Sequence, residues 1–476
     1  MGREIDRDAF TREEFAEFQR RLRDETELLR TWVRDGRLAG SQPRLGLELE
    51  ACIVDDSGRP APRNQEVIDA AGDGRVENEL ARYNLELNTD VHPLRARPFS
   101  TLEAELDQRW GGAREAAHQL GLELGLFGIL PSLRESDFTL AQMTPSPRYT
   151  ALNNQVLALR NRQPLTLDIA GAEPLHLEHP DVMLEAATTS LQLHLQVAPE
   201  RSADAFNAAV AVSAATVGVA ANAPFLFGHR LWEETRVPLF EQAVAVTPLE
   251  PDRAGPLARV GFGSGYARDE LYGFFVENRQ HHPVLLPVLL DEPEEALAHL
   301  RLHNGTIWRW NRPLVEVTGE GCHLRIEHRV MSAGPTLRDV LGNAAFFYGL
   351  VMDLMDRQPN VVESLPFETA EANFYAAARH GLDAEVEWFG GWRGPLAVLI
   401  QEQLLEVAER GLARAGVAEG DAATFLRVIE RRAATAQNGA AWQRGWRQRH
   451  GTDMDALTRA YLERAAQGMP VHEWPL

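Results

Sequence analysis

The chain has 476 residues, of which 44% are hydrophobic and 25% charged, as is typical of a soluble globular protein with a sizeable core. Its net charge of −21 argues against nucleic acid or an anionic membrane surface as a partner. All 48 basic residues are arginine. The absence of lysine excludes Schiff-base, Walker A and kinase-type lysine chemistry, so any use of ATP must depend on arginine and metal.

Cysteine content and apolar runs predict a cytoplasmic protein. Cys52 and Cys322 have neither metal-site spacing nor a disulfide framework, which favours free thiols in a reducing compartment. Residues 1–6 contain no apolar leader segment. The alanine-rich stretch 205–227 is interrupted by polar residues, which favours a buried helix over a membrane span. Whether the protein is a monomer or a homodimer stays open.

The N-terminal part of the chain predicts a helix followed by two strands. Thr11 and Glu14 form a capping box, and apolar residues then recur at helical spacing to about Arg37. Residues 44–51 alternate strictly between apolar and polar side chains, and within residues 80–87 Asn84 and Glu86 alternate with Leu85 and Leu87. This period of two predicts strands with one face on a core.

The next elements alternate between helix and strand. Ser100 is a candidate N-cap with Glu103 three residues on, so a helix is predicted to about residue 126. Residues 128–131 are predicted as a short buried strand, and residues 144–164 as a loop followed by a helix. Residues 188–197 alternate again and predict a further strand.

The second half of the chain becomes mainly helical. The alanine-rich helix should end near Pro224. Residues 304–313 form a turn into an arginine- and tryptophan-rich segment, and residues 322–330 predict a strand. Thr336 is expected to cap a helix that runs through Met355, and helical spacing then dominates to the end of the chain.

With no long linker and no repeat, we expect one catalytic domain over residues 1–476. It would comprise an N-terminal helix (1–40), a sheet-containing core (41–358) and a mainly helical C-terminal part (359–476) packed on that core.

Four of the predicted strands carry polar side chains on one face that suit a metal or phosphate ligand. For a single strand the ordinary interpretation is a solvated ion-pair ladder. Four such faces in one chain favour a ligand site, because paired strands would bring their glutamates together and Mg²⁺ would relieve the repulsion. The four sets are Glu48 with Glu50, Asn84 with Glu86, Gln192 with His194, and Glu327 between Arg325 and Arg329.

These motifs carry a family resemblance. Leu-Glu-Leu-Glu, Tyr-Asn-Leu-Glu-Leu-Asn, Leu-Gln-Leu-His-Leu and Leu-Arg-Ile-Glu-His-Arg, in this order, resemble the glutamate–cysteine ligase type 2 group of carboxylate–amine ligases over roughly residues 44–442. The resemblance implies an α+β fold in which a curved, mainly antiparallel sheet forms an open half-barrel, helices pack outside and the C-terminal part is helical.

The resemblance also implies an activity, that of an ATP-dependent carbon–nitrogen ligase. ATP would phosphorylate the γ-carboxylate of glutamate, and an amine would displace the phosphate to form a γ-glutamyl amide. The expected partners are small molecules, namely glutamate and cysteine (as in glutathione biosynthesis) or another amine.

Residue roles follow from the resemblance position by position. The expected ligands of Mg²⁺ or Mn²⁺ are Glu48, Glu50, Glu86 and Glu327. The expected ATP contacts are Arg325, Arg329, His194 and Gln192. Arg312 and Arg329 are expected to act on the transferring phosphoryl group. Many relatives have histidine where this chain has Gln192, which leaves the second metal position open.

Three further residues are candidate substrate contacts. Arg236 could hold a carboxylate or form a surface ion pair, and Arg148 could contact substrate or pack at a helix end. Asn84 shares its strand face with Glu86 and is assigned to substrate.

Alternative functions remain. The same chemistry could use a different amine or acid, or the protein could bind nucleotide or glutamate without turnover. A carboxylate-pair glycosidase is disfavoured, because flanking arginines would keep a general acid ionised.

Overall fold

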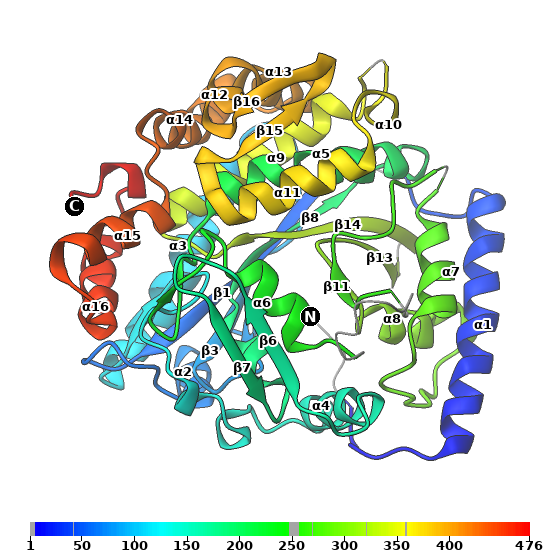
Figure 1. Ribbon diagram of the computed structural model, residues 1–476. Helices are drawn as coiled ribbons and strands as arrows, with labels where there is room; N and C mark the ends of the chain where they lie inside the picture. The colour runs from blue at the N-terminus through cyan, green and yellow to red at the C-terminus, as the bar shows by residue number, and fades with distance from the viewer. Residues whose placement is uncertain (1–4, 41, 247–256, 269, 320, 358) are drawn as a thin grey trace.

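The structure is a computed structural model that describes residues 5–40, 42–246, 257–268, 270–319, 321–357 and 359–476 (Figure 1). Among these residues, eight strands form one antiparallel sheet in the order β13-β14-β8-β1-β3-β2, with β4 and β5 also paired to β1. Its strands are β1 (Arg44–Val54), β2 (Val76–Asn78), β3 (Asn84–Asn88), β4 (His92–Pro93), β5 (Glu123–Gly125), β8 (Ser190–Gln196), β13 (Asn311–Thr318) and β14 (Gly321–Ser332). The predicted α+β fold with a curved antiparallel sheet is confirmed.

The apolar face of the sheet forms the centre of the core. The alternating leucines of its two central strands are each at most 2% exposed: Leu45, Leu47 and Leu49 of β1, and Leu191, Leu193 and Leu195 of β8. Tyr348 packs across this face and donates its hydroxyl to the carbonyls of Gly46 and His194, both at 3.0 Å. Because side chains alternate between faces, burying these leucines turns the polar side chains to the opposite face.

Helices surround the sheet. The longer ones are α1 (Arg12–Arg34), α3 (Pro98–Gln119), α4 (Pro147–Leu159), α5 (Ser202–Ala220), α7 (Tyr272–His281), α9 (Leu337–Leu354), α11 (Phe367–His380), α13 (Leu405–Ala415), α14 (Glu419–Thr435), α15 (Gly439–His450) and α16 (Met454–Ala465). The shorter ones are α2 (Asn64–Ala71), α6 (Arg236–Ala243), α8 (Ala298–Asn304), α10 (Val361–Ser364), α12 (Leu396–Leu399) and the 3₁₀ helix η3 (Val182–Ala187). Small two-stranded sheets comprise β6 (Leu165–Ile169) with β7 (Leu175–His179), β9 (Phe225–Leu226) with β10 (His229–Arg230), β11 (Val260–Gly261) with β12 (Trp308–Arg309), and β15 (Glu385–Trp388) with β16 (Trp392–Pro395).

The central helices α5 and α9 lie against the apolar face of the sheet, and α11 packs on α5 (Figure 1). In length and composition α5 could cross a membrane, yet 89% of its apolar window is buried inside the protein, as expected for a core helix. On the opposite, polar face lie α4, α6 and α8, which leave room for a cavity.

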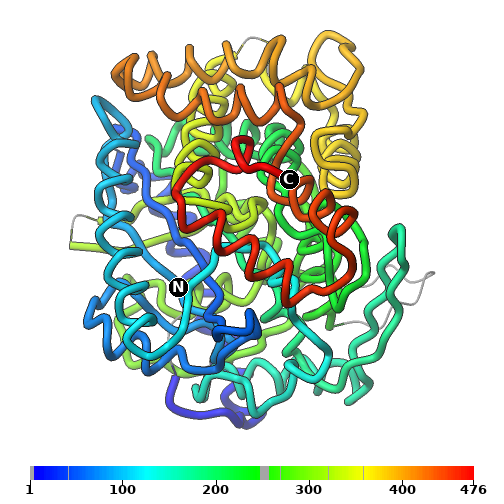
Figure 2. Tube along the Cα trace, turned by 90° about the vertical axis from the view of Figure 1, so that its left-hand side faces the viewer, coloured from blue at the N-terminus to red at the C-terminus, as the bar shows by residue number. Residues whose placement is uncertain are grey.

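The C-terminal helices fold back along the first third of the chain (Figure 2). Asp455 of α16 pairs with Arg134 at 2.7 Å, and the Tyr461 ring stacks on Phe127 with 4.4 Å between centroids. The predicted helical character after residue 360 is confirmed, except for the β15–β16 hairpin.

Several boundaries differ from the sequence prediction. The strand predicted at residues 128–131 is wrong: this is a buried loop whose Gly128 N–H bonds to Asn222 and whose Gly128 carbonyl accepts from Thr189, so its backbone partners come from two separate segments. The strand predicted at residues 80–87 is β3, which begins only at Asn84, because the residues before it form a turn.

Helix caps were predicted correctly where the cap is local. Thr11 and Thr336 both form capping boxes, with Glu14 and Asp339 respectively. Ser100, in contrast, does not cap α3. The carboxylate of Asp421 from α14 accepts hydrogen bonds from the α3 backbone, including the Ser100 N–H at 3.1 Å, so a tertiary contact replaces the predicted serine cap.

Candidate active site

A cavity of about 540 Å³ lies over the polar face of the sheet. This volume is in the range of small-molecule sites. Strands β1, β3, β8, β13 and β14 supply one wall, and α4, η3, the end of α6 and α8 supply the others. Of the predicted site residues, nine line the cavity: Glu48, Glu50, Glu86, Arg148, Gln192, Arg312, Arg325, Glu327 and Arg329.

The most tightly bonded element of the cavity is Glu327, whose side chain is 1% exposed. It accepts two hydrogen bonds from Arg312, at 2.7 and 2.9 Å, and a third from Arg329 at 3.0 Å. Burial disfavours its charged form, but the two guanidinium groups hold the pKa of Glu327 well below its usual range. The carboxylate is therefore ionised, and it fixes both arginines at the cavity wall.

Gln192 connects the ionic group of Arg312, Glu327 and Arg329 to strand β1. Its amide oxygen accepts a hydrogen bond from Arg329, and its amide nitrogen donates to Glu50 at 2.8 Å. Glu50 also accepts from the backbone N–H of Ser190 at 2.7 Å. Gln192 thus positions two ionic groups on the strands at either side of β8.

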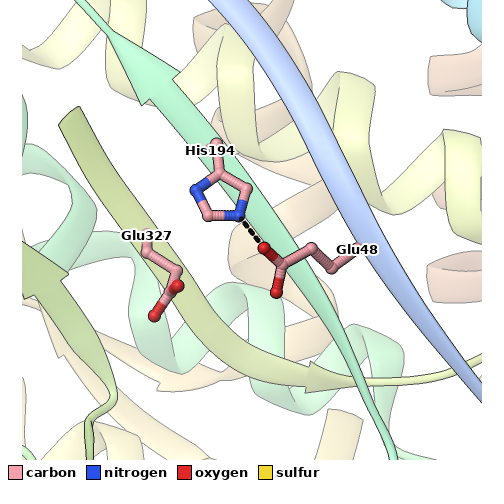
Figure 3. Close-up of side chains that lie close together, drawn as sticks. All are labelled: Glu48, His194 and Glu327. Atoms are coloured by element: carbon pink, nitrogen blue, oxygen red, sulfur yellow. Dashed lines mark hydrogen bonds and ion pairs between the residues drawn. The ribbon is translucent and has the colours of Figure 1, made fainter. Parts of the chain in front are cut away.

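A first group of candidate metal ligands comprises Glu48, His194 and Glu327, from β1, β8 and β14. Their ligand atoms lie within 4.8 Å of one another. The His194 ring and Glu48 form a hydrogen bond of 3.0 Å, with Glu327 on the other side of the ring (Figure 3). Strand register explains the grouping, because Glu327 lies directly opposite His194 in the β14–β8 pair.

A second group comprises Glu50, Glu79 and Glu86, again with ligand atoms within 4.8 Å. Glu50 and Glu86 are directly opposite each other in the β1–β3 pair. Burial and the Glu79 carboxylate raise the pKa of Glu50 to about 7. Burial, with repulsion from Glu48 and Glu79, raises the pKa of Glu86 well above its usual range.

Two residues of this acidic region were not predicted from sequence. Glu79 follows the short strand β2, and Glu185 lies in η3; both line the cavity. Burial, together with Glu79 and Glu50, raises the pKa of Glu185 to about 8. Neither residue belongs to a long alternating strand, so the period-two pattern could not find them.

Two predicted substrate contacts lie elsewhere. Arg236 is 2% exposed and donates to Glu234 at 3.0 Å and to the carbonyl of Val330 at 2.6 Å, so it braces β14 at the border of a smaller adjoining pocket. Asn84 is buried and donates to the carbonyl of Ala186 at 2.8 Å. Neither side chain lines the main cavity.

The remaining predicted residues are placed at the cavity or beside it. Arg148 follows the N-cap of α4, and its Nε has no hydrogen-bond partner among the described residues. Arg325 lies 3.6 Å from Glu316, the distance joining a guanidinium nitrogen to a carboxylate oxygen. His194 is near the cavity through its bond to Glu48.

The sequence profile of glutamate–cysteine ligase family 2 matches residues 44–463, which includes every strand of the central sheet. The chain belongs to glutamate–cysteine ligase family 2. The resemblance drawn from the four strand motifs is thereby confirmed. No curated protein matches the chain significantly.

Two solved structures are similar to this family member at low sequence identity. The glutamate–cysteine ligase of Francisella tularensis, solved in complex with AMP, is 13% identical, with a TM-score of 0.53 over 92% of this chain and 96% of that one. A bifunctional glutathione synthetase from Pasteurella multocida is 14% identical, with a TM-score of 0.48 over 89% of this chain and 53% of that one. The first of these shows that the fold is shared.

The donor set of this family member fits divalent cations. Carboxylate oxygens dominate both groups, as Mg²⁺ and Mn²⁺ prefer. Glu50 and Glu86 are buried with raised pKa values, which indicates negative charge that the protein's own cations leave uncompensated. His194 supplies an imidazole to the first group.

This electrostatic arrangement predicts a pH-dependent response to Mg²⁺. The native pKa values of Glu50 and Glu185, about 7 and about 8, exceed the ordinary value of 4.5. Without metal, the contribution of these two carboxyl groups to the free energy of unfolding is greatest below pH 4.5, their ordinary pKa. That contribution is lost as the pH rises through about 7 to 8. Mg²⁺ binds the ionised form, so it should raise Tm more above about pH 8 than below about pH 7.

Differential scanning calorimetry of the wild type, Glu50→Gln and the exposed control Glu178→Gln measures this effect. Glu50→Gln should lose most of the Mg²⁺-dependent gain in Tm at the higher pH, and the control should keep it. Equal gains in the wild type and Glu50→Gln would contradict the assignment.

Proposed function

We propose that the protein is an ATP-dependent carboxylate–amine ligase that forms a γ-glutamyl amide through an acyl phosphate, with cysteine as the default acceptor. One observation carries the proposal: Glu327 holds Arg312 and Arg329 at the cavity wall, directly beside two groups of metal-competent carboxylates. Fixed guanidinium groups next to carboxylate-rich metal sites suit phosphoryl transfer from a nucleotide. Family membership and the likeness to a ligase solved with AMP support the same chemistry.

In this proposal the nucleotide lies over β13 and β14, because these strands carry the arginines. Arg312, Arg325 and Arg329 would contact its phosphate oxygens, for which guanidinium groups have the matching geometry. Trp308 of β12 and Leu314 of β13, which is paired with Arg325, also line the cavity. Their side chains offer a flat aromatic and an aliphatic surface for the purine base.

Metal ions held by the two carboxylate groups would neutralise phosphate charge and orient the phosphates. The protein's own groups do the rest. Arg312 and Arg329 stabilise the charge that develops as a γ-carboxylate oxygen of glutamate bonds to the terminal phosphorus and the bond to ADP breaks. The amine nitrogen then attacks the acyl carbon, the carbon–oxygen bond to phosphate breaks, and the amine loses a proton.

The substrates would lie towards α4 and η3. Arg148 can pair with the α-carboxylate of glutamate, and its unsatisfied Nε points to an absent acceptor. Glu185 lines the same region, and its carboxylate has no hydrogen-bond partner among the described residues. An amine arrives as an ammonium ion, so a nearby carboxylate can bind it and take its proton. We assign that role to Glu185.

The shape of the cavity favours a second candidate for the acceptor. Next to Glu185 and Arg148 runs an apolar wall that comprises Tyr149, Leu152, Val156, Val182, Phe240 and Val244. An amine with a long apolar substituent would bury that substituent here, at about 25 cal/mol per Å² of apolar surface. Cysteine would leave much of the wall uncovered.

An acceptor panel tests the function and separates the two candidates. We expect ADP release that requires glutamate, Mg²⁺ and an amine together. A preference for cysteine supports the default, and a preference for amines with long apolar substituents supports the second candidate. The absence of amine-dependent ADP release across a broad panel would refute the ligase proposal.

Substitution of Glu327 tests the arginine wall. Glu327→Gln removes the charge that holds both arginines and should lower turnover by about 10²-fold or more, with an unchanged circular dichroism spectrum.

Substitution of Glu185 tests the proton step. Glu185→Gln should lower kcat with an ammonium-type acceptor by about 10²-fold, since general base catalysis contributes on this scale. Hydroxylamine is uncharged near neutral pH, so glutamyl hydroxamate formation should stay close to the wild-type rate. If both acceptors lose activity equally, Glu185 does not act as the base.

A further inference from the structure

A second cavity of about 450 Å³ lies outside the catalytic site, between α1 and the C-terminal end of α7. Its charged and titratable lining residues are Arg23, Arg279, His281 and His282, and none of the aspartates or glutamates that the structure describes lines it. In a protein with a net charge of −21, a cavity whose charged lining groups are arginines is a local reversal of the field.

The two arginines of this cleft differ from their neighbours. On the same helix as Arg23, the guanidinium groups of Arg20, Arg21 and Arg30 each pair with a carboxylate, at 2.6 to 3.4 Å. Arg23 and Arg279 form no ion pair or side-chain hydrogen bond with any residue that the structure describes, and the Nε of Arg279 is buried without a partner. Two guanidinium groups are therefore free to bind an external anion.

His282 is a second, independent sign of a ligand. It is 5% exposed, lines the cleft, and neither ring nitrogen has a hydrogen-bond partner among the described residues. A buried polar group without a partner costs free energy, which a bound acceptor would recover. Burial, with repulsion from Arg309 and Arg259, lowers the pKa of His282 to about 3, so the neutral ring offers one N–H.

The wall of this cleft is bonded directly to the wall of the catalytic cavity. Arg259 donates to the carbonyl of Pro283, which lines the cleft, and to the carbonyl of Thr306 at 2.8 Å, which lines the catalytic cavity. In parallel, Asn278 of α7 donates to Asn304 at 2.8 Å, and Asn304 also lines the catalytic cavity. A shift of residues 278–283 would therefore move residues 304–306.

We propose that the cleft of Arg23, Arg279 and His282 is an effector site for a small organic oxyanion with several negative charges, coupled through Arg259 to the nucleotide side of the catalytic cavity. Phosphate and carboxylate groups both satisfy the two guanidinium groups and the imidazole. The volume accommodates an organic molecule rather than a lone inorganic ion. The site is independent of which amine the enzyme uses.

Isothermal titration calorimetry of the full chain tests the binding, with 3-phosphoglycerate and tricarballylate as probes. An Arg329→Gln background suppresses binding in the catalytic cavity. Adding Arg23→Gln and Arg279→Gln should weaken binding of the favoured probe at least tenfold. Adding Arg20→Gln and Arg30→Gln, on the same helix, should not. The stronger probe identifies a phosphate or a carboxylate ligand.

Two results would overturn the binding proposal: neither probe binds, or the cleft variant binds as tightly as its background. Melting curves of the variants establish that they are folded, and both substituted arginines lie at the surface of the cleft.

ATP affinity in the presence of Mg²⁺ tests the coupling, using the wild type and the Arg23→Gln, Arg279→Gln variant without the active-site substitution. Saturating probe should change the Kd for ATP in the wild type by at least threefold and leave the variant unchanged, because coupling between two sites is reciprocal. An unchanged Kd in the wild type would overturn the coupling. A failure of amide formation would leave both measurements unaffected, so it is distinguishable from failure of this proposal.

Discussion

A buried carboxylate held between two guanidinium groups organises the catalytic cavity. An isolated charge at the position of Glu327 would cost several kcal/mol, so Arg312 and Arg329 have to be in place when the sheet closes. Their bonds tie β13 to β14, and Gln192 extends the connection to β8 and β1. The same bonds aim two positive groups at one wall of the cavity. Stability and phosphate recognition thus depend on one set of contacts.

The carboxylate-rich wall beside these arginines is electrostatically unbalanced. Glu50, Glu79, Glu86 and Glu185 crowd together, and the pKa of each is raised, with burial as the largest cause. Natural sites carry such unfavourable arrangements where a ligand completes them. Divalent cations and a substrate ammonium ion are the partners that would restore the balance. The fold therefore contrasts a compensated, rigid wall for phosphate with an uncompensated wall that awaits cations.

The site residues on the strands could be predicted from sequence, because the pattern that places them lies within each strand. An alternation of leucine with a polar residue fixes which side chains face the ligand, and register then places Glu50 opposite Glu86 and His194 opposite Glu327. Arg236 lies on α6, where no such alternation applies, and the carbonyls of β14 that it binds are near it only in the folded chain.

The parts that could not be predicted depend on contacts between distant segments. Glu79 and Glu185 lie outside regular strands, and nothing in their immediate sequence marks them. Ser100 met the rule for a helix cap, yet Asp421, more than three hundred residues later, takes that place. Local propensity was overridden in each case by tertiary structure.

The central claim is that the γ-carboxylate of glutamate is activated as an acyl phosphate at the Arg312–Glu327–Arg329 wall. Glutamate labelled with ¹⁸O in its γ-carboxylate tests it most directly, with the inorganic phosphate analysed by mass spectrometry during amide formation. Transfer of one ¹⁸O atom to phosphate for each amide formed is the predicted result. Amide formation that releases phosphate without ¹⁸O would contradict the claim.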